Sequence, residues 1–343
     1  MSSASRLHVL SAGLLVSLVG FASAAAVVIK GLEAAGASEG EIASGLAVVT
    51  VVMGLVGLGL SRASRMPISI AWTTPGMALL ATTGAVPGGF AGVVGAFVVT
   101  GVMIVVAGLW EPLGRLVAAI PRPIAAAMLA GILMKLCLAP FVALGKAPLA
   151  ALAVLVTWLV LFRFARVWAA PAAAAVALVI IALGEANAAT ALAFHWPIPV
   201  LIRPVFDLQA LISVALPLFL VTMASQNIPG YAVLATNGYH PRFGPLLVAT
   251  GFASALIAPF GAPTVNLAAI TAALAAGPDA HPDPARRWTV AAVAGLGYVV
   301  IAAFAAVAVG LVTRSSPLLV EAAAGLALLG ALGASLNSAI SDE

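Results

Sequence analysis

Apolar stretches long enough to cross a membrane recur along almost the whole chain, and they restrict its fold more than any other feature. They run from Leu7 to Ile340, with short interruptions at charges, prolines and glycines. Because a span needs about 20 apolar residues and must bond its own backbone groups, these runs predict roughly a dozen transmembrane helices. With 63% hydrophobic and 8% charged residues, the 343-residue chain leaves no room for a soluble domain. The sequence predicts an all-α polytopic membrane protein.

The basic residues flank the apolar runs and form no patch, so nucleic acid is not expected as a partner. If the N-terminus lies inside the cell, ten of the fifteen Lys and Arg residues fall in cytoplasmic loops and four on the opposite side. The remaining one, Lys135, lies within a span, where we expect its side chain to reach the interface. This is the positive-inside pattern. We therefore expect a multi-pass plasma membrane protein with a cytoplasmic N-terminus.

The chain repeats itself with an offset of about 195 residues, judged from matching spans. Pro67 opens "PISIAWTTPGMALLA" 56 residues before Pro123, which opens "PIAAAMLAGILM". Pro263 opens "PTVNLAAITAALAAG" 54 residues before Pro317, which opens "PLLVEAAAGLAL". A constant offset across several segments indicates a duplicated unit, which we place at residues 1–190 and 200–343.

The first unit is expected to contain seven crossings, and that number sets the topology of the second unit. The crossings are at 8–30, 42–60, 67–83, 88–109, 121–140, 148–165 and 168–184. Because seven is odd, the second unit begins on the opposite side of the membrane, which predicts two inverted repeats. Two such units need roughly 390 residues, so counterparts of the sixth and seventh spans are expected to be missing from the second unit.

The third and tenth spans carry helix-breaking and polar residues at membrane depth. Each opens with a stretch unsuited to continuous helix, "PISIAWTTPG" and "APFGAPTVN", and continues for about ten residues as good helix. We interpret each as a short strand followed by a half-helix, with N-termini that face each other and offer free N–H groups to a small anion such as a carboxylate. The candidate binding residues are Thr73, Thr74, Gly76, Thr264 and Asn266. The polar side chains among them are placed either to cap the half-helix ends or to bond a ligand. The alternative is that proline and glycine only kink ordinary spans.

Two further groups of residues are candidates for substrate contact. The segment "MASQNIPGY" places Gln226 and Asn227 before Pro229, so we expect the helix to break there. Its two amides either donate to a carboxylate or mark an interfacial helix end. Trp72 lies within the extended stretch, and with Phe21 it either stacks on an aromatic ligand or simply packs.

Few titratable residues lie in apolar surroundings. Glu321, four residues into the helix that begins at Pro317, is the candidate for proton coupling, although a carboxylate there also favours the helix dipole. The loop "GPDAHPDPARR" is interpreted as a solvated cytoplasmic turn. With four histidines outside the expected core, we find no nucleophile–base set and no metal cluster. An enzyme, a metal site and a cofactor are therefore not expected.

The chain resembles the benzoate:proton symporters of the BenE type along its whole length. The matching stretches are "MPISIAWTTPGMALLA", "PRPIAAAMLAGILM", "TMASQNIPGYAVLATNGYHP" and "FGAPTVNLAAITAA". The resemblance implies the wider fold of the uracil permease-like and sulfate transporter-like carriers, in which spans one to four of each unit form a substrate-binding core and the others form a gate. Carried over, the core is about 8–109 and 207–313, and the gate about 121–184 and from 317 onward.

The resemblance also implies a function, namely secondary active uptake of benzoate or a similar aromatic carboxylate with a proton across a bacterial-type inner membrane. Uracil permease-like carriers have a glutamate at the position of Gln226 and another at that of Val265, and both are missing here. The alternative is therefore an exchanger, or an uncoupled carrier or channel, for another small organic anion or a nucleobase. Carriers of this fold are often dimers, so a homodimer is compatible with the sequence.

Overall fold

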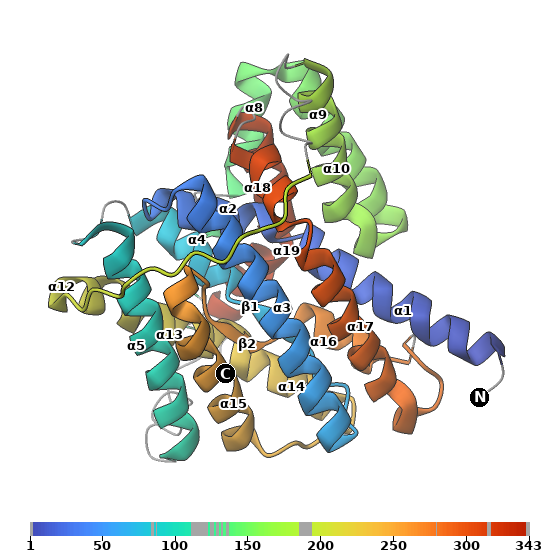
Figure 1. Cartoon of the computed structure of the whole chain (residues 1–343). Helices are drawn as coiled ribbons and strands as arrows, with labels where there is room; N and C mark the ends of the chain where they lie inside the picture. The colour runs from blue at the N-terminus through green and yellow to red at the C-terminus, as the bar shows by residue number, and fades with distance from the viewer. Residues whose placement is uncertain are drawn as a thin grey trace.

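The computed structural model describes residues 3–83, 86, 88–110, 123, 127, 130–131, 133–134, 137–184, 194–278, 280–313 and 317–340. Helices make up nearly all of this part of the chain, and two short strands lie near its centre (Figure 1). The helices of the first half are α1 (Ser3–Ala22), α2 (Ala25–Ala34), α3 (Glu39–Ser64), α4 (Thr74–Thr83), α5 (Gly89–Leu109), α8 (Ala139–Lys146), α9 (Pro148–Phe164) and α10 (Arg166–Gly184). Those of the second half include α15 (Phe243–Ile257), α16 (Ile270–Ala276), α17 (Arg287–Ala302), α18 (Ala305–Thr313) and α19 (Pro317–Ile340).

Several of the predicted spans appear as helices of membrane-crossing length. In the described residues, five helical segments are long and apolar enough to span a bilayer, and a sixth is added if α17 and α18, which meet at a 60° bend, count as one span. Helices α9, α10 and α19 contain shorter apolar stretches of 10–17 residues. The prediction of a helical polytopic membrane protein is confirmed. The predicted span 121–140 lies mostly outside the described residues, as does Lys135.

The third and tenth spans are each a strand followed by a half-helix, as predicted. Strand β1 (Ile70–Trp72) leads into α4, which has 10 residues, and β2 (Val265–Leu267) leads into α16, which has 7. Both helices are too short to cross a bilayer, since a helix rises about 1.5 Å per residue. The simple kink of a continuous span is therefore excluded for both segments.

The predicted helix break near Gln226 is wrong. The chain stays helical from Leu208 to Thr236, as α12 (Leu208–Ala210), η1 (Leu211–Ala215), α13 (Leu216–Thr222), η2 (Met223–Asn227) and α14 (Ile228–Thr236). The segments η1 and η2 are π-helical turns, and each ends two residues before a proline, Pro217 and Pro229. A wider i→i+5 turn accommodates the missing N–H and the bulk of the proline ring without ending the helix.

The second span of each half packs against the fourth span of the other half. Helix α3 of the first half packs against α17 of the second, and α5 packs against α15. A Cβ atom on Gly295 would lie 2.5 Å from the Gly54 carbonyl oxygen, and one on Gly251 would lie 2.7 Å from that of Gly101. Gly251 follows Gly54 by 197 residues and Gly295 follows Gly101 by 194, which agrees with the repeat offset seen in the sequence. Backbones thus meet at glycines in both symmetry-related contacts.

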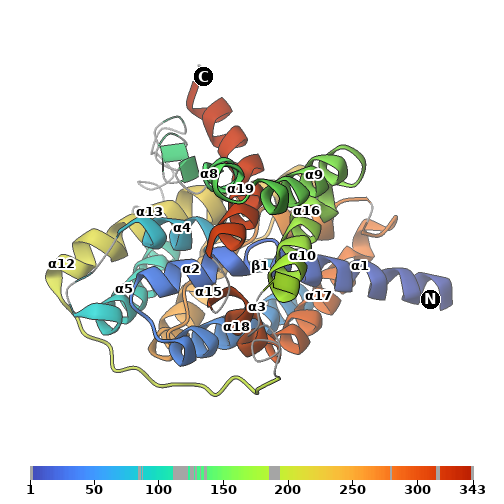
Figure 2. The same ribbon diagram turned by 90° about the horizontal axis from the view of Figure 1, so that it is seen from above.

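An extended strap connects the two halves. Residues 194–206 have no regular secondary structure and run along one edge of the molecule (Figure 2). The strap is held by backbone donors: Val200 N–H to Ser44 Oγ on α3 at 2.8 Å, Ile202 N–H to the Pro259 carbonyl at 2.7 Å, and Val205 N–H to the carbonyl of Ala91 on α5 at 3.0 Å. It therefore ties together helices assigned to the predicted core.

The helices assigned to the predicted gate form a group of their own. Helices α8, α9, α10 and α19 pack mainly on one another, and α8 to α10 lie together on one side of the molecule (Figure 1). Their main contacts with the other helices involve α1, α2 and α18. This grouping is compatible with a core and a gate, and that division remains a prediction.

The glycine contact between α3 and α17 leads to a stability prediction. Gly295→Ala places its Cβ against the backbone of α3, so the two helices must separate. We expect the free energy of unfolding to fall by about 1–3 kcal/mol. The matched control is Gly59→Ala on α3, where no atom lies within 4 Å of the new Cβ. Thermal unfolding in detergent, followed by size-exclusion chromatography, should show a lower midpoint for Gly295→Ala alone. Equal midpoints for both variants would contradict the close contact.

Candidate substrate site

The strands β1 and β2 pair with each other to form what we call the broken-span ribbon. They are antiparallel, with Ile70 opposite Leu267, Ala71 opposite Asn266 and Trp72 opposite Val265. The pairing extends by one bond at each end: Thr73 N–H donates to the Thr264 carbonyl at 3.1 Å, and Ala268 N–H donates to that of Ser69 at 3.0 Å. Each of these bonds is the counterpart of the other at an offset of 195 residues (264 − 69 and 268 − 73). An approximate two-fold axis therefore passes between Ala71 and Asn266.

The register divides the candidate residues between two faces of the ribbon. Side chains alternate along a strand, and residues opposite each other in an antiparallel pair share a face. Ala71, Thr73, Thr264 and Asn266 therefore lie on one face, which we call the polar face. Trp72 and Val265 lie on the other. The hydroxyl and amide candidates of the two half-spans thus come together, and the predicted aromatic contact of Trp72 is on the opposite side.

Thr73 connects the ribbon to its surroundings. Its hydroxyl lies 2.8 Å from the Thr222 hydroxyl on α13, and it accepts a hydrogen bond from Gly76 N–H at 3.3 Å. The Thr73 carbonyl accepts from Met77 N–H at 2.9 Å. Among residues 74–77, Pro75 has no N–H, so three amide donors remain, and those of Gly76 and Met77 are already in use. In this conformation the amides of Gly76 and Met77 are therefore not free to bind an anion, and the predicted anion contact of α4 stays a prediction.

Asn227 has a structural role in this conformation. Its Oδ1 accepts from Leu267 N–H at 3.0 Å on the outer edge of β2, and its Nδ2 lies 3.3 Å from Met223 Sδ. Ser254 on α15 holds the same edge, since its Oγ contacts Val265 N at 2.9 Å and Val265 O at 3.1 Å. Sequence reasoning did not identify Ser254, because a lone serine in an apolar helix gives no distinct signal.

Thr264 and Asn266 are the candidates that keep unused hydrogen-bonding capacity. Both side chains are fully buried. Within the described residues, Thr264 Oγ1 and Asn266 Oδ1 have no hydrogen-bond partner, whereas Asn266 Nδ2 donates to the Leu267 carbonyl at 3.2 Å. Buried polar atoms in native proteins are nearly always paired, so two unpaired atoms on one face of a strand need an explanation. A polar ligand that completes their bonds provides one.

The aromatic candidates contact each other beside the ribbon. The rings of Phe21 on α1 and Trp72 lie with centroids 5.5 Å apart and planes at 61°, in an edge-to-face arrangement. Trp72 is only 2% exposed, while Phe21 is half-buried. Of the two alternatives left by the sequence, mutual packing is therefore what this conformation shows. An edge-to-face pair of this kind contributes about 0.5–1.5 kcal/mol beyond its buried area.

The other predicted residues differ in their placement. Gln226 on η2 and Thr74 at the start of α4 are half-buried and make no side-chain hydrogen bond to any described residue. Gly76 lies so close to Thr73 that an added Cβ would be 2.6 Å from Thr73 Oγ1. Glu321 is half-buried on α19, which packs mainly on α8, α9 and α10 and not on the ribbon.

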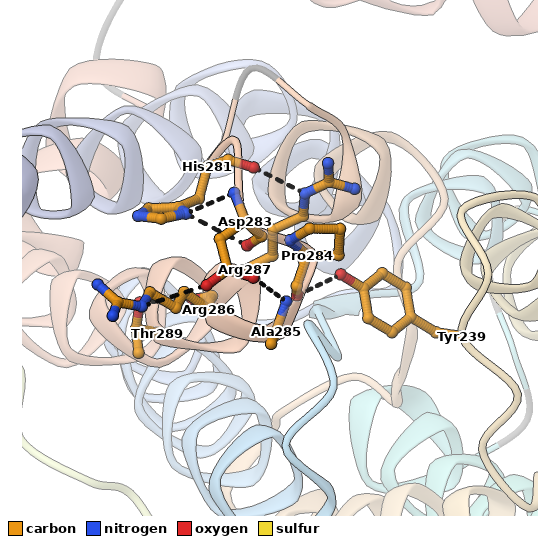
Figure 3. Close-up of polar contacts among 8 residues, drawn as sticks. All are labelled: Tyr239, His281, Asp283, Pro284, Ala285, Arg286, Arg287 and Thr289. Carbon is orange, nitrogen blue, oxygen red and sulfur yellow. Dashed lines mark hydrogen bonds and ion pairs between the residues drawn. The ribbon is translucent and has the colours of Figure 1, made fainter.

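The C-terminal end of α16 is held by a buried arginine. Arg287 Nη1 donates to the Ala276 carbonyl at 2.8 Å and its Nε to that of His281 at 2.9 Å, the latter contact being visible in Figure 3. A cation is favourable at the negative end of a helix dipole. Arg287 is 8% and His281 7% exposed, so the interpretation of this whole turn as solvated is wrong. The two hydrogen bonds of Arg287 thus hold the end of α16, the half-helix that continues from β2.

The chain is similar in sequence to two known proteins. The chain is 38% identical over 339 residues to the inner membrane protein YdcO of Escherichia coli (strain K12), covering 97% of this chain and 85% of that protein. It is 31% identical over 341 residues to the benzoate membrane transport protein of Acinetobacter baylyi (strain ATCC 33305 / BD413 / ADP1), covering 97% and 84%.

Among solved structures, the transmembrane domain of the cyanobacterial bicarbonate transporter BicA has the same fold. It superposes with a TM-score of 0.57 at 16% identity and covers 98% of both chains. The predicted inverted-repeat membrane fold is thereby confirmed. The model of the family described as benzoate membrane transport protein, BenE, matches residues 3–343, which also confirms that the chain is a transporter and not an enzyme. From this match and the two relatives, the chain belongs to the BenE family of membrane transport proteins.

Proposed function

We propose that this protein takes up benzoate or a similar aromatic carboxylate together with a proton across the inner membrane. The observation that carries the proposal is the polar face of the broken-span ribbon, where Thr264 and Asn266 keep unpaired, fully buried polar atoms deep in an apolar protein. The names of the family and of its Acinetobacter relative supply the aromatic acid. The name of the Escherichia coli relative supplies the inner membrane, and the distribution of basic residues supports a cytoplasmic N-terminus.

Transport in this scheme is a movement of the core relative to the gate. The core is the ribbon with α1 to α5 and the matching helices of the second half, and the gate contains α8, α9, α10 and α19. Two features support a rigid core. Helix α3 packs on α17 and α5 packs on α15, so the two halves interlock, and the strap hydrogen-bonds to α3, to α5 and to Pro259. A site on the approximate two-fold axis can face either side of the membrane with little internal change.

An uncoupled carrier or exchanger of another organic anion is the alternative function. It is favoured by one observation, that Gln226 and Val265 stand where related carriers have glutamates. Glu321 remains the side-chain candidate for proton coupling. Because α19 packs mainly on α8, α9 and α10, Glu321 would act on substrate bound at the ribbon only indirectly. Direct measurement of coupling separates the two functions.

Coupling is tested by labelled benzoate uptake into proteoliposomes. An inside-alkaline pH gradient should drive accumulation above the level in protein-free liposomes, because the proton moves down its gradient with the substrate. A protonophore should remove the accumulation. Protein-free liposomes are essential because neutral acids cross bilayers unaided. Accumulation that ignores the pH gradient and the protonophore would favour the uncoupled carrier.

The polar face is tested by Thr264→Val and Asn266→Leu. Each removes hydrogen-bonding groups from the proposed site, so we expect initial uptake rates to fall about tenfold to a hundredfold, as for the loss of a bond worth about 1–3 kcal/mol. The matched control is Thr250→Val on α15, a buried threonine whose hydroxyl bonds the carbonyls of Leu246 and Leu247 in its own helix. All variants should reach the membrane in equal amounts. Normal uptake by both site variants would exclude this face as the binding site.

A further inference from the structure

We propose that the polar face binds the substrate as the neutral, protonated acid, so that the coupled proton crosses the membrane on the carboxyl group of the substrate. This inference rests on the proposed function and specifies which chemical form of the substrate is carried. In the complex, the acid O–H donates to Asn266 Oδ1 and the Thr264 hydroxyl donates to the carbonyl oxygen of the acid.

The orientation of Asn266 decides what its free atom can bind. Its Nδ2 donates to the Leu267 carbonyl, so the amide cannot be reversed without placing two acceptor oxygens against each other. The unpaired atom, Oδ1, is therefore an acceptor and needs a donor. A carboxylate has acceptors only, whereas a carboxylic acid has one O–H donor and one carbonyl acceptor. Of the two forms, only the protonated acid supplies a donor to Asn266 Oδ1.

Thr264 is placed to complete the pair. It lies two residues before Asn266 on the same extended segment, so both side chains project from one face with Cα atoms about 7 Å apart. A threonine hydroxyl rotates and can donate, and its Oγ1 has no partner among the described residues. Opposite Asn266 is Ala71, the half-buried central residue of β1, which adds no polar group to this face. One donor and one acceptor therefore match the two ends of a carboxyl group.

The charges around the ribbon do not favour an anion. The elements that pack most closely on β1 and β2 are α3, α14, α15, α16 and η2. Of these five elements, α15, α16 and η2 have no titratable side chain. Helix α3 has Glu39 and Glu41 in its first turn and Arg62 in its last turn, and α14 has Tyr231, which packs on Phe243.

A buried carboxylate without a cation or several donors is costly, and burial favours its neutral form. The amides of α4 do not change this balance, since Gly76 and Met77 already bond Thr73. The site as folded thus selects against charge. No proton-carrying side chain is required at the ribbon, which explains how Gln226 and Val265 can stand where related carriers have acids.

The proton balance is simple. Outside the cell the carboxylate takes up one proton from the medium, the acid binds, and on the inner side it is released and dissociates into carboxylate and one proton. One proton moves with each substrate, and no net charge crosses the membrane.

The test is equilibrium binding of labelled benzoate to the purified full chain in detergent, with two competitors. Benzamide is neutral and offers an N–H donor and a carbonyl acceptor, whereas benzenesulfonate is always an anion and offers acceptors only. We expect the Kd for total benzoate to rise about tenfold per pH unit between about pH 5.5 and about pH 7.5, as the protonated fraction falls. Benzamide should compete equally at every pH, and benzenesulfonate should not compete.

Two controls accompany the measurement. Thr250→Val should retain this pattern, and Asn266→Leu should weaken the binding of benzoate and benzamide about equally. A pH-independent Kd, with competition by benzenesulfonate and not by benzamide, would show that the anion binds and would overturn this inference while leaving benzoate transport intact. Absence of benzoate binding at every pH would overturn the proposed function as well.

Discussion

The need to pair every backbone N–H and C=O inside the bilayer governs this structure. Two spans begin as extended strands near the centre of the molecule, where backbone groups are exposed that lipid cannot bond. The chain solves this by pairing the two exposed segments with each other, as β1 and β2, and by using Ser254 and Asn227 to bond the outer edge of β2. The ribbon exists because each broken span provides the partner of the other.

The rest of the helical packing supports this central pairing. The antiparallel register requires the two half-spans to run in opposite directions, which inverted repeats achieve. The same symmetry brings α3 onto α17 and α5 onto α15, and glycines at Gly54, Gly101, Gly251 and Gly295 allow those helices to approach closely. Close packing replaces the hydrophobic effect, which gives little stabilisation between helices in lipid.

The proposed site is apolar except for a few hydrogen-bonding atoms. Thr73 and Asn227 use their side chains to hold the ribbon, and Thr264 and Asn266 retain free capacity on its polar face. The aromatic pair Phe21 and Trp72 lies on the opposite face, where it supports the ribbon.

The sequence by itself determined that the chain lies in a lipid bilayer, that it contains two repeats and where the broken spans are. Hydropathy, proline, glycine and a constant offset are all local or periodic signals. Only the tertiary structure decided which polar residues keep free atoms. The helix around Gln226 continues through π-helical turns, Asn227 bonds β2 and the Thr73 hydroxyl contacts that of Thr222. None of these could be predicted, since each depends on a partner distant in the chain or on relief of proline strain by wider turns. Hydrogen-bond capacity is a property of a residue type, but whether it is used depends on which neighbours folding brings within reach.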